Sequence, residues 1–136
     1  MKLFITGIGT DVGKTIASSI IVEALEADYW KPIQAGDLDN SDTKKLEKYV
    51  SNPTTKFHKN AYALQTPASP HYAAAIDGNT IHLNQIKEPK TTNHLVVEGA
   101  GGVLVPLNTT DCVIDIIQPD YKVIVVSRNH NYFIIR

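Results

Sequence analysis

Four short, mostly apolar runs divide the chain, and each is bounded by glycine, proline or polar residues. They cover residues 3–6, 29–33, 94–98 and 122–127. Apolar runs of this length, bounded by turn residues, are typical of strands that are buried on both faces of a parallel sheet. The pattern therefore predicts four strands, the second of which ends where Pro32 and Gly36 force a turn.

Segments with helical spacing separate these strands. Residues 14–27 carry apolar side chains three or four positions apart, and the polar run 44–49 follows Ser41 and Asp42, either of which could cap a helix. We predict further short helices over residues 70–75, 83–86 and 111–118. Alternating strands and helices predict an α/β fold, a parallel sheet flanked by helices, with ligands bound beyond the carboxyl ends of the strands.

The first strand leads into the sequence Gly7-Ile8-Gly9-Thr10-Asp11-Val12-Gly13-Lys14-Thr15. Glycines let backbone N–H groups turn inward around a phosphate, and a lysine and a hydroxyl at the following helix start can reach the terminal phosphates and Mg²⁺. Five residues, one more than is usual, separate Gly7 from Gly13. The alternative is a glycine turn with an incidental lysine, but the strand before and the helix after favour a phosphate-binding loop, and hence a P-loop NTPase-like fold.

Three more charged residues lie at or after the ends of predicted strands. Lys31 lies near the end of the second strand, Asp42 follows it, and Glu98 ends the third strand before a glycine-rich turn, as in a Walker B strand. Hard oxygen ligands suit Mg²⁺, so we predict a metal site formed by Thr15, Asp42 and Glu98. Lys31 is expected to converge with Lys14 on a transferred phosphate. Two alternatives stay open: Asp42 could be a helix cap, and Lys31 could be an ordinary surface lysine.

Composition narrows the class of protein. The chain has 136 residues, enough for one domain over residues 1–136, and its formal net charge of −1 provides no basic surface for nucleic acid. Its one cysteine excludes an internal disulfide, and no apolar run approaches the length of a membrane span. We expect a soluble cytoplasmic protein that interacts with neither nucleic acid nor membrane.

Four motifs occur together in the order found in dethiobiotin synthetases, and on these motifs the chain resembles that family. They are Thr6-Gly7-x5-Gly13-Lys14-Thr15, Lys31-Pro32-x3-Gly36, Asn40-Ser41-Asp42 and Val97-Glu98-Gly99-Ala100-Gly101-Gly102. The resemblance implies an ATP- and Mg²⁺-dependent ligase that joins CO₂ to 7,8-diaminononanoate, closes a cyclic urea, and releases ADP and phosphate. It further implies that a carbamate takes the γ-phosphoryl group and that the neighbouring amine then displaces phosphate.

The resemblance also implies roles for individual residues. Lys31 is the family's active-site lysine, and Thr10 and Lys14 lie near the carbamate. The nucleotide-binding set comprises Asp11, Val12, Gly13, Lys14, Thr15, Ile16, Asp42, Glu98, Gly99, Ala100 and Gly101. The metal ligands are Thr15, Asp42 and Glu98, and the family's dimeric assembly implies a homodimer.

The chain departs from the family pattern in two ways. Ala35 stands where the family has a substrate-contacting hydroxyl, whose role would pass to Gln34 or to a backbone group. The motifs also fade after residue 128, and the tail 129–136 is atypical, with an apolar stretch at 132–135, so we expect an incomplete, C-terminally truncated member. Two alternatives remain: a non-catalytic nucleotide-binding fragment, and a partitioning-type P-loop ATPase, whose usual extra lysine is replaced here by Ile8 and Gly9.

Overall fold

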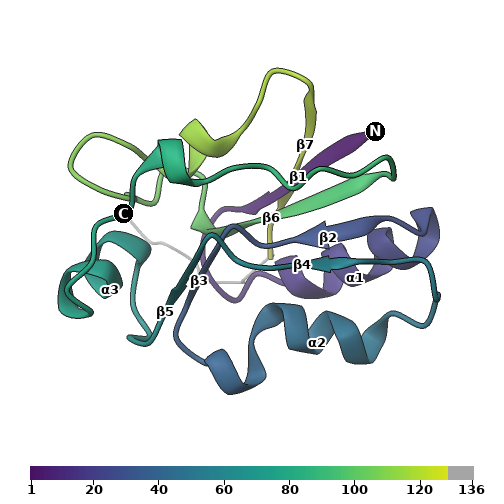
Figure 1. The fold of residues 1–136 in the computed structure, drawn as a ribbon, viewed down its shortest axis with the longest axis horizontal. Coiled ribbons are helices and arrows are strands. Elements are labelled where there is room, and N and C mark those ends of the chain that lie inside the picture. Colours follow the sequence, from purple (N-terminus) through teal and green to yellow (C-terminus); the bar gives the residue numbers. More distant parts are fainter. Residues whose placement is uncertain (129–136) are drawn as a thin grey trace, which may run out of the picture.

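The computed structural model describes residues 1–128, which form a five-stranded parallel sheet of order β4-β2-β6-β1-β7 (Figure 1). The strands are β1 (Lys2–Gly7), β2 (Asp28–Trp30), β4 (Phe57–His58), β6 (Leu95–Gly102) and β7 (Tyr121–Val126). The two longest apolar runs, β1 and β6, lie side by side at the centre, as expected of strands buried on both faces. The predicted α/β fold is confirmed.

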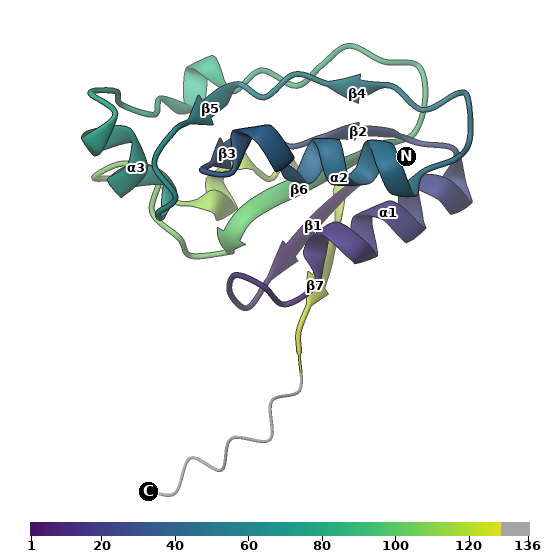
Figure 2. The same ribbon diagram turned by 90° about the horizontal axis from the view of Figure 1, so that it is seen from below.

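Two helices, α1 (Lys14–Leu25) and α2 (Asp42–Tyr49), lie together on one face of the sheet (Figures 1 and 2). Their buried Val22 and Leu46 pack against Ile5 and Val96 of the central strands. The helix α1 ends at Leu25, two residues earlier than predicted, because Glu26 adopts a left-handed φ of 48°. Ser41 caps α2: its hydroxyl accepts a hydrogen bond from the Lys44 backbone N–H at 3.3 Å.

The opposite face is covered by shorter elements. They are α3 (Pro70–Ile76), the 3₁₀ turns η2 (Leu83–Gln85) and η3 (Val113–Ile116), and a separate two-stranded parallel sheet of β3 (Ile33–Ala35) and β5 (Tyr62–Leu64). A further 3₁₀ turn, η1 (Leu38–Asn40), leads into α2. The core on this face includes Phe4, Val97 and Ala73. The central strands are therefore covered on both faces, whereas the edge strand β7 exposes Val123 and Val125.

The predicted strand 29–33 is wrong as a single element. It divides into β2 and β3, which belong to different sheets, and Lys31 and Pro32 form the break. Proline has no N–H to continue the ladder. Its carbonyl instead accepts hydrogen bonds from the backbone N–H groups of Ala61 and Tyr62, which lead into β5. The break turns the chain out of the main sheet directly after β2.

The predicted helix over residues 111–118 is also wrong, since only the 3₁₀ turn η3 forms there. Cys112 is held in an extended conformation by an antiparallel bridge to Pro106, and its N–H donates to the Asp115 carboxylate. Pro119 follows closely. These contacts leave room for one tight turn. The short helix predicted over residues 83–86 forms as the 3₁₀ turn η2.

The expectations about residues 129–136, including the apolar stretch at 132–135, lie outside the described residues. Within residues 1–128, no helix has the length and apolar character needed to cross a membrane.

Candidate functional site

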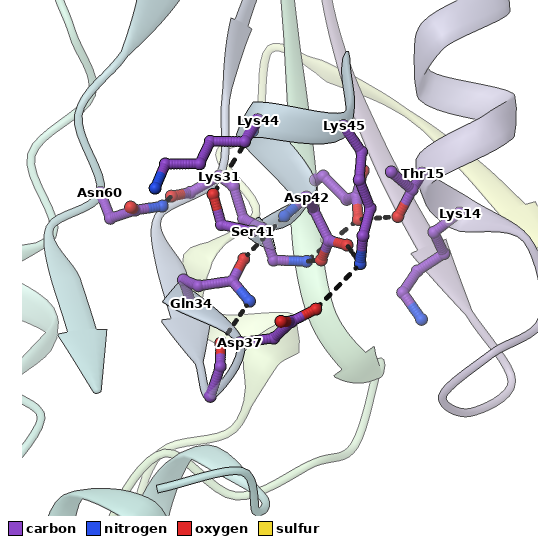
Figure 3. Close-up of polar contacts among 12 residues, drawn as sticks. Lys14, Thr15, Lys31, Gln34, Asp37, Ser41, Asp42, Lys44, Lys45 and Asn60 are labelled. Atoms are coloured by element: carbon purple, nitrogen blue, oxygen red, sulfur yellow. Dashed lines mark hydrogen bonds and ion pairs between the residues drawn. The ribbon is translucent and has the colours of Figure 1, made fainter. Parts of the chain in front are cut away.

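A cleft of about 530 Å³ opens at the carboxyl ends of β1, β2 and β6 (Figure 3 shows its polar contacts). Parallel strands bring their carboxyl ends to one edge, so the loops after three neighbouring strands meet there. Eleven of the predicted site residues line this cleft: Thr10, Asp11, Gly13, Lys14, Thr15, Ile16, Lys31, Asp42, Glu98, Ala100 and Gly101. Motifs from the first loop to the end of β6 thus share one cavity.

The loop between β1 and α1 depends on glycine at both of its ends. A Cβ on Gly7 would lie 2.6 Å from Cγ2 of Val12, closer than real contacts allow, and a tight 3.1 Å from the Gly9 carbonyl oxygen. Gly13 has a φ of 101°, which L side chains rarely adopt, and α1 begins at the next residue. Because Gly13 has no side chain to cap the helix, the first N–H groups of α1 are left for another acceptor.

Lys14 folds back over this loop. Its Nζ donates a hydrogen bond to the Gly9 carbonyl oxygen at 2.6 Å, and its side chain lines the cleft. Burial, and next the nearby positive charge of Lys31, lower the pKa of Lys14 below its ordinary value. An anion bound in the cleft would favour the charged ammonium and so offset both effects.

A buried ion cluster of Lys31, Asp42 and Glu98 lies beside the loop (Figure 3). Nζ of Lys31 lies 2.5 Å from Oδ2 of Asp42 and 3.0 Å from Oε1 of Glu98, and the side chain of Glu98 is only 1% exposed. Burial alone would lower the pKa of Lys31, but the two carboxylates outweigh it and raise the pKa. For Asp42, burial opposes ionisation, yet the charge of Lys31 holds its pKa below the ordinary range.

Strand register brings this cluster together. Trp30 pairs with Val97, so Lys31 comes level with Glu98 immediately beyond the end of β2. Asp42 is the first residue of α2, and its backbone N–H donates to Oε1 of Gln34 at 3.3 Å. The strand β3 and the start of α2 are thus tied to each other at the cleft wall.

Glu98 has partners on both carboxylate oxygens. Oε1 accepts from the Thr15 hydroxyl at 3.2 Å as well as from Lys31, and Oε2 accepts from the Tyr29 hydroxyl at 3.0 Å. Burial, together with the negative charge of Glu98, raises the pKa of Tyr29 well above its ordinary value. Tyr29 therefore acts as a hydrogen-bond donor to the carboxylate.

The side-chain oxygens of Thr15, Asp42 and Glu98 are the hard ligands that Mg²⁺ prefers. Asp42 and Glu98 both contact Nζ of Lys31, and the Thr15 hydroxyl donates to Glu98. Within residues 1–128, no group of three or more His, Cys, Asp or Glu side chains could hold a metal ion by itself. Two carboxylates and a hydroxyl fit a magnesium ion that keeps waters or phosphate oxygens as its other ligands.

Two predicted binding residues lie elsewhere among the described residues. Val12 packs against Gly7, and Gly99 lies under Phe4 and Val113, where a Cβ would come within 3.1–3.2 Å of their side chains.

The sequence analysis missed Tyr29 as a partner of Glu98. It also missed Lys45, which lines the cleft and whose Nζ lies 3.6 Å from Oδ1 of Asp42. The helical spacing of three between Asp42 and Lys45 could have indicated the second contact.

Gln34 does not have a free amide to replace the hydroxyl missing at Ala35. Its Nε2 donates to the Gly36 carbonyl oxygen at 2.9 Å, and its Oε1 accepts from Asp42. Both residues line the cleft, and Ala35 is half-buried. The amide of Gln34 therefore shapes the wall, and the cleft surface at Ala35 is apolar.

Comparison with known proteins agrees with these motifs. A family model described as an AAA domain matches residues 1–135. A protein of Christiangramia forsetii named ATP-dependent dethiobiotin synthetase BioD is 58% identical over 93% of this chain and 61% of its own length. A protein of Cytophaga hutchinsonii with the same name is 51% identical over 93% of this chain and 62% of its own length.

A third protein with this name, from Afipia carboxidovorans, is 46% identical over 85% of this chain and 55% of its own length. The chain thus spans 55–62% of the length of these three curated relatives. The similarity covers the phosphate loop, the ion cluster and the sheet that carries them. The chain belongs to the AAA domain family, within which it is a homologue of the dethiobiotin synthetases.

Proposed function

We propose that this chain carries the phosphate-binding and metal-binding part of an ATP-dependent dethiobiotin synthetase. The enzyme closes a cyclic urea from 7,8-diaminononanoate and CO₂, with release of ADP and phosphate. The observation that carries the proposal is the convergence of Lys14, Thr15, Lys31, Asp42 and Glu98 in one cleft. The names of relatives at 46–58% identity support it.

The chemistry needs no nucleophile from the protein. One substrate amine adds to CO₂ to give a carbamate, and a carbamate oxygen attacks the γ-phosphorus of ATP, which displaces ADP. The second amine then attacks the carbonyl carbon of this mixed anhydride, closes the ring and expels phosphate. Positioning and charge stabilisation are therefore the catalytic tasks, as in other phosphoryl transfers.

The cleft residues match these tasks. Backbone N–H groups of residues 11–16 would hold the phosphates, and Lys14 and Lys31 would offset the charge on the transferred group, with Thr10 near the carbamate. Thr15, Asp42 and Glu98 would hold Mg²⁺. When bound, that ion would supply positive charge that offsets the negative charge of the phosphates. Release of Lys14 from Gly9 would turn its ammonium toward the phosphates.

A non-catalytic nucleotide-binding fragment is the second candidate, and the coverage of only 55–62% of the relatives' lengths favours it. The two candidates differ in turnover, because both require phosphate binding. The homodimer that the family resemblance implies is likewise a proposal for this chain, tested by light scattering after size-exclusion chromatography. The cytoplasm is the proposed compartment, and fractionation of the native cells tests it.

The deciding experiment incubates the full chain with 7,8-diaminononanoate, bicarbonate, Mg²⁺ and ATP, and measures dethiobiotin and ADP. Lys14→Ala should lower the rate by at least about 100-fold, the scale of a lost transition-state contact. The matched control is Lys44→Ala, since Lys44 is exposed and its ammonium donates to the Asp39 carbonyl oxygen, while its bond to the cap of α2 comes from the backbone N–H. Binding of Mg²⁺ and ATP by a folded chain without turnover would favour the fragment instead.

A further inference from the structure

The hydroxyl of Tyr29 is fully buried behind the ion cluster and bonds to Glu98. Tyr29 pairs with Val96 across β2 and β6, and Glu98 lies two residues further along β6, on the same face. The tyrosine ring thus runs along the sheet toward the carboxyl edge, and its hydroxyl meets Oε2 of Glu98 from below the cleft at 3.0 Å. No motif that defines the site includes this tyrosine.

The two carboxylate oxygens of Glu98 have different surroundings: one is bonded within the core, and the other is bonded at the cleft. Oε2 accepts from Tyr29, while Oε1 accepts from Thr15 and Lys31, both of which line the cleft. We propose that Tyr29 is a positioning residue, which fixes the Glu98 carboxylate so that Oε1 faces the metal and phosphates. The inference rests on the proposed function and adds to it a residue that acts through Glu98.

Physical reasons favour this role. A buried carboxylate on a flexible side chain can rotate unless both of its oxygens are held, and hydrogen-bond partners behind a metal ligand set its orientation. Tyr29 is suited to hold one oxygen because its own ring is fixed. It packs in the core beneath α1 and α2, with the ring of Phe57 at a centroid distance of 6.2 Å and a tilt of 60°.

A purely structural role is the competing explanation, in which the hydroxyl only satisfies a buried acceptor. Both explanations predict a loss of stability in Tyr29→Phe, so stability cannot separate them. The positioning role predicts in addition weaker binding of a divalent ion and slower chemistry at saturating substrate. A structural role predicts neither of these in the folded protein.

The test measures Mn²⁺ binding in the presence of ATP by electron paramagnetic resonance. Tyr29→Phe should weaken binding by about 10–100-fold, the usual effect of losing a partner behind a metal ligand. It should lower kcat while leaving KM for the diamine within about twofold. The matched control, Tyr62→Phe, removes the hydroxyl of another buried tyrosine, which bonds to Gln85 and His82 in the other core, and should change Mn²⁺ affinity by less than about twofold.

Two unnatural side chains at position 29 keep the test decisive if Tyr29→Phe fails to fold. p-Aminophenylalanine retains a donor at the same reach and should rescue Mn²⁺ binding, whereas p-methylphenylalanine fills the same volume without a donor and should not. Equal Mn²⁺ affinity in wild type and in either folded variant without the donor overturns the inference alone. A folded wild-type chain that binds no Mn²⁺ with ATP overturns the proposed function, and the inference falls with it.

Discussion

The two edges of the main sheet both bury a carboxylate, but they hold it differently. At the amino edge, Asp28 begins β2 with its side chain 1% exposed, and accepts from the Lys56 backbone N–H, the Asn93 amide and the His58 ring at 2.9–3.2 Å. At the carboxyl edge, Glu98 is equally buried, yet two of its partners belong to the cleft. The same strand, β2, contributes to both arrangements.

Burial of a carboxylate therefore does not by itself identify a functional site. The partners of Asp28 come from a backbone group, a short amide and a ring, and they tie the loops before β4 and β6 to the start of β2. The main partner of Glu98 is the ammonium of Lys31, which is shared with Asp42 beside a cavity of about 530 Å³. Charge shared across an open cavity can be redistributed when an anion or a cation binds.

The largest expected effect is at the carboxyl edge. Lys31→Met leaves Glu98 buried without its cation, and breaking a buried ion pair in this way should cost about 3–5 kcal/mol in the free energy of unfolding. Urea unfolding at neutral pH measures the loss. The double variant Lys31→Met/Glu98→Gln should recover much of it, because the fully buried charge is then gone, while Asp42 is 20% exposed and keeps Lys45 at 3.6 Å. A loss below about 1 kcal/mol would show that the cluster is not held as a buried ion pair.

At the amino edge, a smaller loss is expected. Asp28→Ala removes the acceptor of the Lys56 N–H and of the His58 ring, while the Asn93 amide keeps the Glu26 carbonyl oxygen, and should destabilise the fold by about 1–3 kcal/mol. Binding of a fluorescent ATP analogue to the folded variant should match that of the wild type, since Asp28 lies at the opposite end of β2. Loss of nucleotide affinity in Asp28→Ala would contradict the separation of the two edges.

The contribution of Asp28 to the free energy of unfolding should also depend on pH. Burial would raise the pKa of Asp28, but hydrogen bonds from Thr91, His58 and Lys56 outweigh it and hold the pKa below its ordinary value of 3.8. The folded state thus binds fewer protons, so this stabilisation is complete above pH 3.8 and is lost as pH falls through the lower folded-state pKa. Asp28→Asn removes this titration while keeping the side chain's shape.

Urea unfolding of wild type and Asp28→Asn, compared from about pH 5 down to about pH 3, measures that pH dependence. The stability advantage of the wild type should shrink as the pH falls. An advantage that stays constant, or grows, over this interval would mean that Asp28 does not titrate as the hydrogen bonds require.

The sequence predicted the carboxyl edge well, because its residues follow apolar strands within glycine-rich motifs. It predicted β1, β6, β7, α1, α2 and the convergence of Lys14 with Lys31 on the same basis, but missed the short strands β4 and β5. Local signals could not show that Pro32 would send the chain into a second sheet, or that a bridge between Pro106 and Cys112 would replace a helix. Both depend on partners distant in sequence or on loop geometry. Tyr29 was missed because a tyrosine in an apolar strand looks like core.

The smallest effect concerns the open side of the carboxyl edge. Ala35 lines the cleft at the position where the dethiobiotin synthetase motif has a hydroxyl. The amide of Gln34 is already hydrogen-bonded to Gly36 and Asp42. Ala35→Ser should therefore add a hydrogen bond to the diamine without displacing an existing one. One such bond contributes about 1 kcal/mol, so KM for 7,8-diaminononanoate should fall about three- to tenfold while kcat changes little.

Ala63→Ser is the matched control, because Ala63 pairs with Gln34 in the same small sheet but is exposed outside the cleft. Both substitutions should leave the free energy of unfolding within about 0.5 kcal/mol of the wild type, as is usual at positions with room for a hydroxyl. Steady-state kinetics then isolates the effect on substrate. An unchanged KM in Ala35→Ser, or an equal change in both variants, would mean that the wall at Ala35 does not face the diamine.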